Sequence, residues 1–239
     1  MNFWNEAQKK ETDVWLRSDA EPFSQLKKRA ELMFNYLYLD TDKVSENLNA
    51  LEIGGANAPV ITLLKFKLRY IVDPIFENIK EKIPDVYAPK EDDKVYSEAA
   101  ENLNFISDNT LDAIFCLNVL DHTEKPELIL NEIHRVMKPD GRALLSIDYF
   151  SFFWLLLRSV RVKITGKKEN DILHPHHFTL DSLVSMLKKN NFKLARGFIA
   201  PGDGFSKSSN YNSNSEYPFI NSFSKKIKSA ARFYVVITK

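Results

Sequence analysis

Short apolar runs alternate with helical segments along most of the chain. Apolar residues at helical spacing between residues 3 and 37 predict two helices, and Asp40-Thr-Asp ends this stretch. From residue 49 onward the pattern changes to strands separated by helices. Strands are expected at residues 49–54, 69–73, 94–96, 111–117 and 142–148, with a closing pair at 192–199 and 232–238.

Three helices are predicted between these strands. Residues 59–67 form a short first one. Pro126 opens the second, whose apolar face runs to Met137 and which stops at Lys138-Pro-Asp-Gly, where Gly141 permits a positive φ. Thr179 caps the third, which ends at Asn190-Asn191. Strands that alternate with helices predict a mostly parallel sheet covered on both faces.

Composition and charge are those of an ordinary globular protein, with 44% hydrophobic and 27% charged residues. The net charge is only +1, which argues against a nucleic-acid partner. A single cysteine, Cys116, excludes an internal disulfide and fits a reducing compartment. The first residues lack the apolar core of a signal peptide, and no run reaches the roughly 18 apolar residues of a membrane span. We therefore expect a cytoplasmic protein.

A ligand-binding turn is predicted where the first strand ends. Leu51-Glu-Ile-Gly-Gly-Ala-Asn-Ala places small residues at a strand-to-helix turn, where the backbone can approach a nucleotide-like ligand. Asp73 ends the next strand about twenty residues later and can accept both hydroxyls of a ribose. The Gly-x-Gly-x-x-Gly fingerprint of nicotinamide-dependent enzymes is absent.

The turn resembles motif I of the class I S-adenosylmethionine-dependent methyltransferases, an acid-x-Gly-x-Gly-x-Gly pattern. Glu52 and Gly54 match this motif, whereas Ala56 and Ala58 replace its second and third glycines. Three further segments resemble the type 11-like members of the family in order and spacing, namely residues 100–122, 133–146 and 174–183. The resemblance covers about residues 48–200.

This resemblance implies an α/β fold, a Rossmann-like seven-stranded and mostly parallel sheet with helices on both faces, an antiparallel last strand and an N-terminal helical extension. It implies a single methyltransferase domain over residues 1–239. Within that domain we expect an N-terminal helical cap (1–44), a cofactor-binding core (45–150) and an acceptor-side segment (151–239) with a lid, the last helix and the closing strands.

The resemblance also implies S-adenosyl-L-methionine as the cofactor, S-adenosyl-L-homocysteine as its product, and no metal. The residues expected at the methionine part, the ribose, the adenine and the end of the fourth strand are Glu52, Gly54, Gly55, Ala56, Asp73, Pro74, Ala100, Glu101, Asn118 and Val119. Ala99 departs from the family, which often has Asp at this position, so contact with the adenine is expected to rest on backbone groups.

A hydroxyl acceptor needs a base, and histidine titrates near working pH. His122 follows the fourth strand, at the edge where such sheets bind ligands, and His174 and His177 precede the last helix. These three histidines are the catalytic candidates, and a structural role bonded to backbone stays open for each. A magnesium ion held by Asp121 or Asp148 also stays open.

The acceptor is the least determined part of the function. The segment from Phe3 to Trp15 is similar to N-terminal helices of methyltransferases of polysaccharide assembly, which favours O-methylation of a sugar hydroxyl in a glycan or glycan precursor. The aromatic run at 149–161 is interpreted either as a core helix or as a lid over the acceptor, and the basic residues that follow as a solvated face or a contact with phosphate or a membrane surface. A small metabolite or a lipid-quinone is the alternative acceptor. A non-catalytic, methyltransferase-like partner protein is a further alternative, suggested by Ala56, Ala58 and Ala99.

Overall fold

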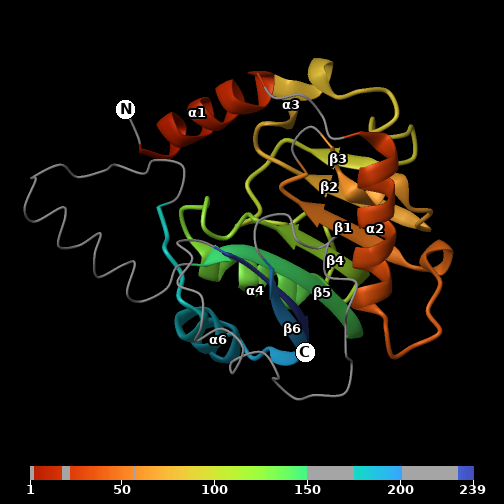
Figure 1. The fold of residues 1–239 in the computed structure, drawn as a ribbon, viewed down its shortest axis with the longest axis vertical. Helices are drawn as coiled ribbons and strands as arrows, with labels where there is room; N and C mark the ends of the chain where they lie inside the picture. The colour runs from red at the N-terminus through yellow and green to blue at the C-terminus, as the bar shows by residue number, and fades with distance from the viewer. Residues whose placement is uncertain (1–2, 18–21, 56–57, 150–174, 201–230) are drawn as a thin grey trace, which may run out of the picture.

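The computed structural model describes residues 3–17, 22–55, 58–149, 175–200 and 231–239. Two helices, α1 (Phe3–Arg17) and α2 (Phe23–Leu37), precede an α/β core (Figure 1). The strands are β1 (Asn49–Ile53), β2 (Leu68–Val72), β3 (Lys94–Tyr96), β4 (Leu111–Leu117), β5 (Met137–Tyr149), β6 (Lys193–Ala200) and β7 (Ala231–Thr238). The remaining α-helices are α3 (Phe76–Ile79), α4 (Pro126–Val136) and α6 (Leu180–Lys189), and the short 3₁₀ turns are η1 (Ser45–Asn47), η2 (Val60–Leu63) and η3 (Lys80–Lys82).

The strands form one seven-stranded sheet in the order β3-β2-β1-β4-β5-β7-β6. Strands β1 to β5 are parallel to one another, and β7 runs antiparallel to both β5 and β6. This topology confirms the predicted Rossmann-like fold with its antiparallel last strand and N-terminal helices. The division into cap, core and acceptor-side segment stays a prediction, and residues 150–174 and 201–230 lie outside the described part of the chain.

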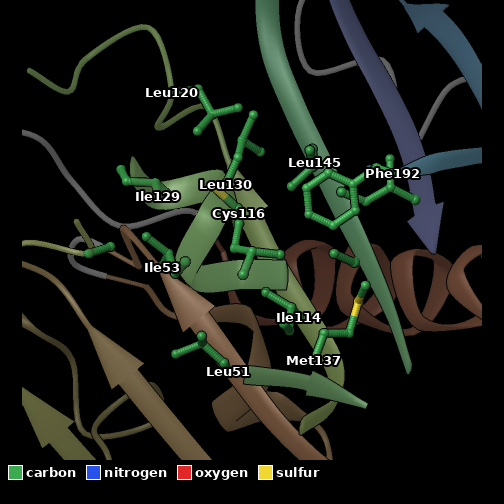
Figure 2. Close-up of a cluster of buried hydrophobic side chains, with 14 of the residues drawn as sticks. Leu51, Ile53, Ile114, Cys116, Leu120, Ile129, Leu130, Met137, Leu145 and Phe192 are labelled. Carbon is green, nitrogen blue, oxygen red and sulfur yellow. The ribbon is translucent and has the colours of Figure 1, made fainter. Parts of the chain in front are cut away.

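Side chains of alternating strand residues form two apolar clusters, one on each face of the sheet. On one face, Leu51, Cys116 and Leu145 pack with side chains of α4 and α6, as Figure 2 shows for part of this cluster. On the other face, α2 packs against a second cluster that includes Phe115 and Leu144. Cys116 is fully buried, as its apolar neighbours predicted. None of the helices in the described ranges is long and apolar enough to cross a membrane.

Two predicted elements differ from the structure. The helix expected at residues 59–67 is only the short turn η2, because the Lys67 N–H donates to the Leu48 oxygen and not to a helical partner four residues earlier. The buried carboxylate of Glu52 caps the turn by accepting hydrogen bonds from the N–H groups of Val60 and Ile61. The helix α4 ends at Val136, and Met137 already pairs with Leu111 at the start of β5. Pairing with β4 overrides the helical pattern at this position.

Gly141 does not adopt the positive φ that glycine permits. Among the described glycines only Gly54 has a positive φ. Gly141 is instead required for space, since a Cβ there would lie 2.8 Å from both the Leu111 oxygen and Met137 Cγ. The predicted cap of the last helix is confirmed, because Thr179 and Ser182 form a reciprocal capping box and Asn191 adopts a φ of 63°.

The strand order places a crevice between β1 and β4. From β1 the chain proceeds through β2 and β3 to one side of the sheet, and β4 and β5 lie on the other side. The connections that leave the carboxyl ends of β1 and β4 therefore diverge, which opens the crevice where sheets of this kind bind ligands.

Candidate functional site

A cavity of about 600 Å³ lies at this crevice. Its walls come from the ends of β1, β2, β4, β5 and β7, from the residues after β3, and from α1. Ligand pockets commonly measure about 300–1,000 Å³, so this cavity is large enough for a nucleoside-sized cofactor and an acceptor group. The cavity-lining residues include nine of the predicted cofactor residues, namely Glu52, Gly54, Gly55, Asp73, Pro74, Ala100, Glu101, Asn118 and Val119. Ala56 lies outside the described residues.

Gly54 directly follows β1 and lies against Val119, which follows β4. Its φ is +74°, and a Cβ at this position would lie 2.4 Å from Val119 Cγ2. Its N–H donates to the Val72 oxygen, 2.9 Å away. Only glycine satisfies both the left-handed backbone and the lack of space beside β4. The absence of a side chain at Gly54 thus leaves space for the cavity between the ends of β1 and β4.

We expect Gly54→Ala to lower the stability of the protein by about 1–3 kcal/mol, through backbone strain and overpacking against Val119. Adding Val119→Ala should recover the part that comes from overpacking and leave the backbone strain. Thermal unfolding of wild type, both single variants and the double variant measures this coupling. Strictly additive losses would mean that Gly54 and Val119 do not compete for the same space.

Glu52 shapes the loop after β1. It is 3% exposed, and its Oε1 and Oε2 accept hydrogen bonds from the N–H groups of Val60 (3.0 Å) and Ile61 (2.9 Å). Burial raises the pKa of Glu52 to about 7, against the lowering effect of these donors and of Arg29. Both carboxylate oxygens already hold backbone donors, so Glu52 fixes the loop, and its contact with the methionine part stays a prediction.

Asp73 is buried at the carboxyl end of β2 and lines the same cavity. Its Oδ1 accepts a hydrogen bond from the N–H of Ile75 at 3.0 Å, and its own N–H donates to the Tyr96 oxygen at 3.1 Å. These bonds fix the turn after β2. The contact of this carboxylate with a ribose stays a prediction.

His122 lines the cavity with its side chain 15% exposed. Its Nε2 lies 3.1 Å from Asn118 Nδ2 and 3.7 Å from Asp121 Oδ2, and its Nδ1 lies 3.9 Å from Glu11 Oε2. The fold thus places the ring of His122 between a carboxylate from its own loop and one from α1. Asn118 is held with φ 60°, and its buried Oδ1 has no hydrogen-bond partner among the described residues.

Of the other two catalytic candidates, only His177 belongs to the described part of the chain. His177 is absent from the cavity-lining residues, and His174 lies outside the described ranges. Their neighbour His176 does reach the loop after β4, where its N–H donates to the Asp121 oxygen at 3.4 Å. In the described part of the chain, no three His, Cys, Asp or Glu residues are grouped to hold a metal ion.

Two walls of the cavity were missed from the sequence. One is a face of α1 whose residues recur at helical spacing, namely Trp4, Ala7, Gln8, Glu11, Val14 and Trp15. The other is formed by two cross-strand pairs of β5 and β7, Ser146 with Tyr234 and Asp148 with Arg232. Asp148 Oδ1 accepts a hydrogen bond of 2.8 Å from Arg232 Nε. Helical spacing could have revealed the first wall, whereas the second depends on strand pairing across a long gap.

Residues 51–145 match the family model described as a methyltransferase domain. A Bacillus subtilis protein named as a methyltransferase, YrhH, is 26% identical over 142 residues, which cover 58% of this chain and 78% of YrhH. The geranyl diphosphate C-methyltransferase of Streptomyces coelicolor superposes with a TM-score of 0.59 at 10% identity, over 97% of each chain. The N-methyltransferase NodS of Bradyrhizobium japonicum gives a TM-score of 0.58 at 12% identity, over 96% of this chain and 97% of NodS.

The match of residues 51–145 to a methyltransferase domain and the fold together support a class I S-adenosylmethionine-dependent methyltransferase. Its cofactor is S-adenosyl-L-methionine, and both solved neighbours are complexes with S-adenosyl-L-homocysteine. They are named for methylation at carbon and at nitrogen, so the shared fold does not determine which acceptor atom this enzyme methylates.

The residues of the cavity fit this cofactor. The space beside Gly54, which a Cβ would fill, leaves room for backbone to approach a ligand. The buried Asp73 supplies acceptors for a diol, and the Oδ1 atom of Asn118 is available to a donor such as an amino group. Ala99 and Ala100 also line the cavity, as expected if backbone groups meet the adenine.

Proposed function

We propose that the enzyme methylates a hydroxyl group of a sugar, in a glycan or glycan precursor, with His122 as the general base. The observation that carries this proposal is the polar wall beside His122. Past the cofactor residues, the cavity continues over Ser146, Asp148, Arg232 and Tyr234. These side chains offer both donors and acceptors of hydrogen bonds at the side of the crevice away from Asp73.

The strand order divides the cavity between two ligands. Seven of the nine predicted cofactor residues that line the cavity follow β1, β2 or β3 or lie at the end of β1, whereas Asn118 and Val119 follow β4, and the polar wall belongs to β5 and β7. An acceptor bound against β5 and β7 would meet the cofactor at the end of β4, beside Asn118 and His122. This arrangement supports His122, rather than His177, as the base.

The cofactor supplies a methyl group on a sulfonium, which is already activated for in-line displacement. The protein contributes alignment and removal of the hydroxyl proton. A ring nitrogen of His122 takes this proton, and the carboxylates of Asp121 and Glu11 stabilise the resulting imidazolium. A positioned base contributes about 10²–10⁴-fold to the rate. Helix α1 excludes water from the same region by forming one wall.

The chemistry of the lining favours a sugar over a lipid-quinone. A quinone ring with an isoprenoid tail would be accommodated by an apolar wall, whereas the Asp148–Arg232 ion pair would stay partly unsatisfied beside it. Hydroxyl groups of a sugar can donate to Asp148 and accept from Arg232 at once. Trp4 adds an apolar surface from α1. The aromatic run at 150–161 lies outside the described residues, and its role as a lid stays a prediction.

Acceptor profiling with methyl-tritiated cofactor tests this proposal. We expect label transfer to methyl glycosides or sugar nucleotides and none to quinols or small amines. Asp148→Asn should raise the KM for the sugar about 10- to 100-fold, because a hydrogen bond to a charged group is lost. Asp140→Asn is the matched control, since Asp140 lies on the same strand but pairs with Lys43 and is 69% exposed. Transfer to quinols alone, or equal KM values in the two variants, would refute the sugar assignment.

A further inference from the structure

Helix α1 presents one continuous face to the catalytic cavity. Trp4, Gln8, Glu11 and Trp15 line the cavity and recur every three to four residues along the helix. Trp15 also packs against Ile75 and Ile79, next to the turn that holds Asp73. Figure 1 shows α1 running past the sheet toward α3. The cofactor side of the fold therefore anchors this helix.

Glu11 is the only carboxylate among these α1 residues, and it faces His122. Its Oε2 lies 3.9 Å from His122 Nδ1, with the Glu11 side chain 34% exposed. This separation is longer than a hydrogen bond, but catalytic hydrogen bonds are often long before substrate binds and tighten in the complex. Because about two thirds of the Glu11 side chain is shielded from water, its charge acts on the ring more strongly than the charge of a fully exposed carboxylate would.

The opposite nitrogen of the ring has two neighbours. Asn118 Nδ2 lies 3.1 Å from His122 Nε2, and Asp121 Oδ2 lies 3.7 Å from the same atom. An amide N–H at the closer distance donates to an unprotonated Nε2, which requires the ring proton on Nδ1. Asp121 alone would favour the other tautomer, with the proton on Nε2. The carboxylate of Glu11 at Nδ1 decides between these two states.

We propose that Glu11 is a positioning residue that holds the ring proton of His122 on Nδ1 and so keeps Nε2 unprotonated, as it must be to take the proton of the acceptor. The role parallels that of a carboxylate that orients a catalytic imidazole. It rests on the proposed role of His122 as the base. It also gives α1 a role in the reaction. This helix packs beside the turn that holds Asp73, and it carries the Glu11 carboxylate next to His122.

Nitrogen-15 NMR of the imidazole rings tests this inference without an acceptor. Spectra of the labelled protein with S-adenosyl-L-homocysteine, at a pH where the rings are neutral, report which nitrogen carries the proton. His122→Gln assigns the signal by its loss. We expect the Nδ1–H tautomer in the wild type and a shift toward Nε2–H in Glu11→Leu, because the ring then turns to Asp121. Glu11→Gln keeps a hydrogen-bond acceptor and should retain the wild-type tautomer.

Glu6→Leu is the matched control, since Glu6 lies on the same helix and pairs with Lys10 at the surface. It should leave the ring signals unchanged. An unchanged tautomer in Glu11→Leu would overturn the inference, as would an Nε2–H tautomer in the wild type. Binding of S-adenosyl-L-homocysteine to each variant verifies the fold.

The outcomes for Glu11 and for His122 are separable. An unchanged tautomer in Glu11→Leu, together with an inactive His122→Gln variant, refutes the positioning role and leaves the base in place. A fully active His122→Gln variant refutes the base, and with it the positioning role, whatever the spectra show. With a sugar acceptor, Glu11→Leu should lower kcat about tenfold or more at unchanged KM, and Glu11→Gln should recover most of this loss.

Discussion

Replacing Asp73 by asparagine should weaken the binding of S-adenosyl-L-homocysteine about 100-fold or more. The carboxylate lines the cavity at the end of β2, and loss of its charge removes the strong hydrogen bonds to a diol, each contributing about 1.5–3 kcal/mol. Asparagine retains an oxygen for the N–H of Ile75, so the turn after β2 should keep its shape. Quenching of tryptophan fluorescence measures the affinity, because Trp4 and Trp15 line the same cavity.

Asp92→Asn serves as the control for Asp73→Asn, since Asp92 is exposed just before β3, at the opposite end of the parallel strands β2 and β3. It should bind S-adenosyl-L-homocysteine like the wild type. Equal affinities for wild type and Asp73→Asn would remove Asp73 from the cofactor site and require the ligand to lie elsewhere in the cavity.

Replacing His122 by glutamine should lower the rate of methyl transfer about 10²–10⁴-fold, the contribution of a positioned general base. The affinity for S-adenosyl-L-homocysteine should change less than threefold, because His122 lies on the acceptor side of β4 while Asp73 and Gly54 keep their places. Single-turnover transfer of labelled methyl to a sugar acceptor measures the chemical step directly.

His134→Gln is the matched histidine control. His134 lies on α4, where it packs against Phe192 with ring centroids 5.3 Å apart, and it does not line the cavity. Its replacement should leave transfer unchanged. If His122→Gln lost activity only in proportion to a lower unfolding temperature, the structural interpretation of this histidine would replace the catalytic one.

The sheet was predictable because its strands are short apolar runs bounded by turn residues. The fourth strand was predicted at residues 111–117, which are the bounds of β4. Patterns failed where a tertiary contact overrides local preference. The Lys67 N–H bonds to the Leu48 oxygen in place of a helical partner, and pairing with Leu111 takes Met137 out of the helix.

The meeting of Gly54 and Asp73 at one cavity was predictable for a different reason. Both stand directly after strands, so the topology alone brings them to one edge of the sheet. The wall proposed to bind the acceptor was not predictable, because Asp148 meets Arg232 only through the antiparallel pairing of β5 with β7. The approach of Glu11 to His122 likewise depends on where α1 packs, which no local pattern specifies.

Calorimetric titration of the purified chain with S-adenosyl-L-homocysteine tests most directly whether the cavity between β1 and β4 is the cofactor site of a methyltransferase. We expect one molecule to bind per chain with micromolar affinity, and the heat to disappear in Asp73→Asn at the same ligand concentration. No heat at millimolar ligand, in a chain that is shown to be folded, would contradict the cofactor assignment and favour the non-catalytic, methyltransferase-like alternative.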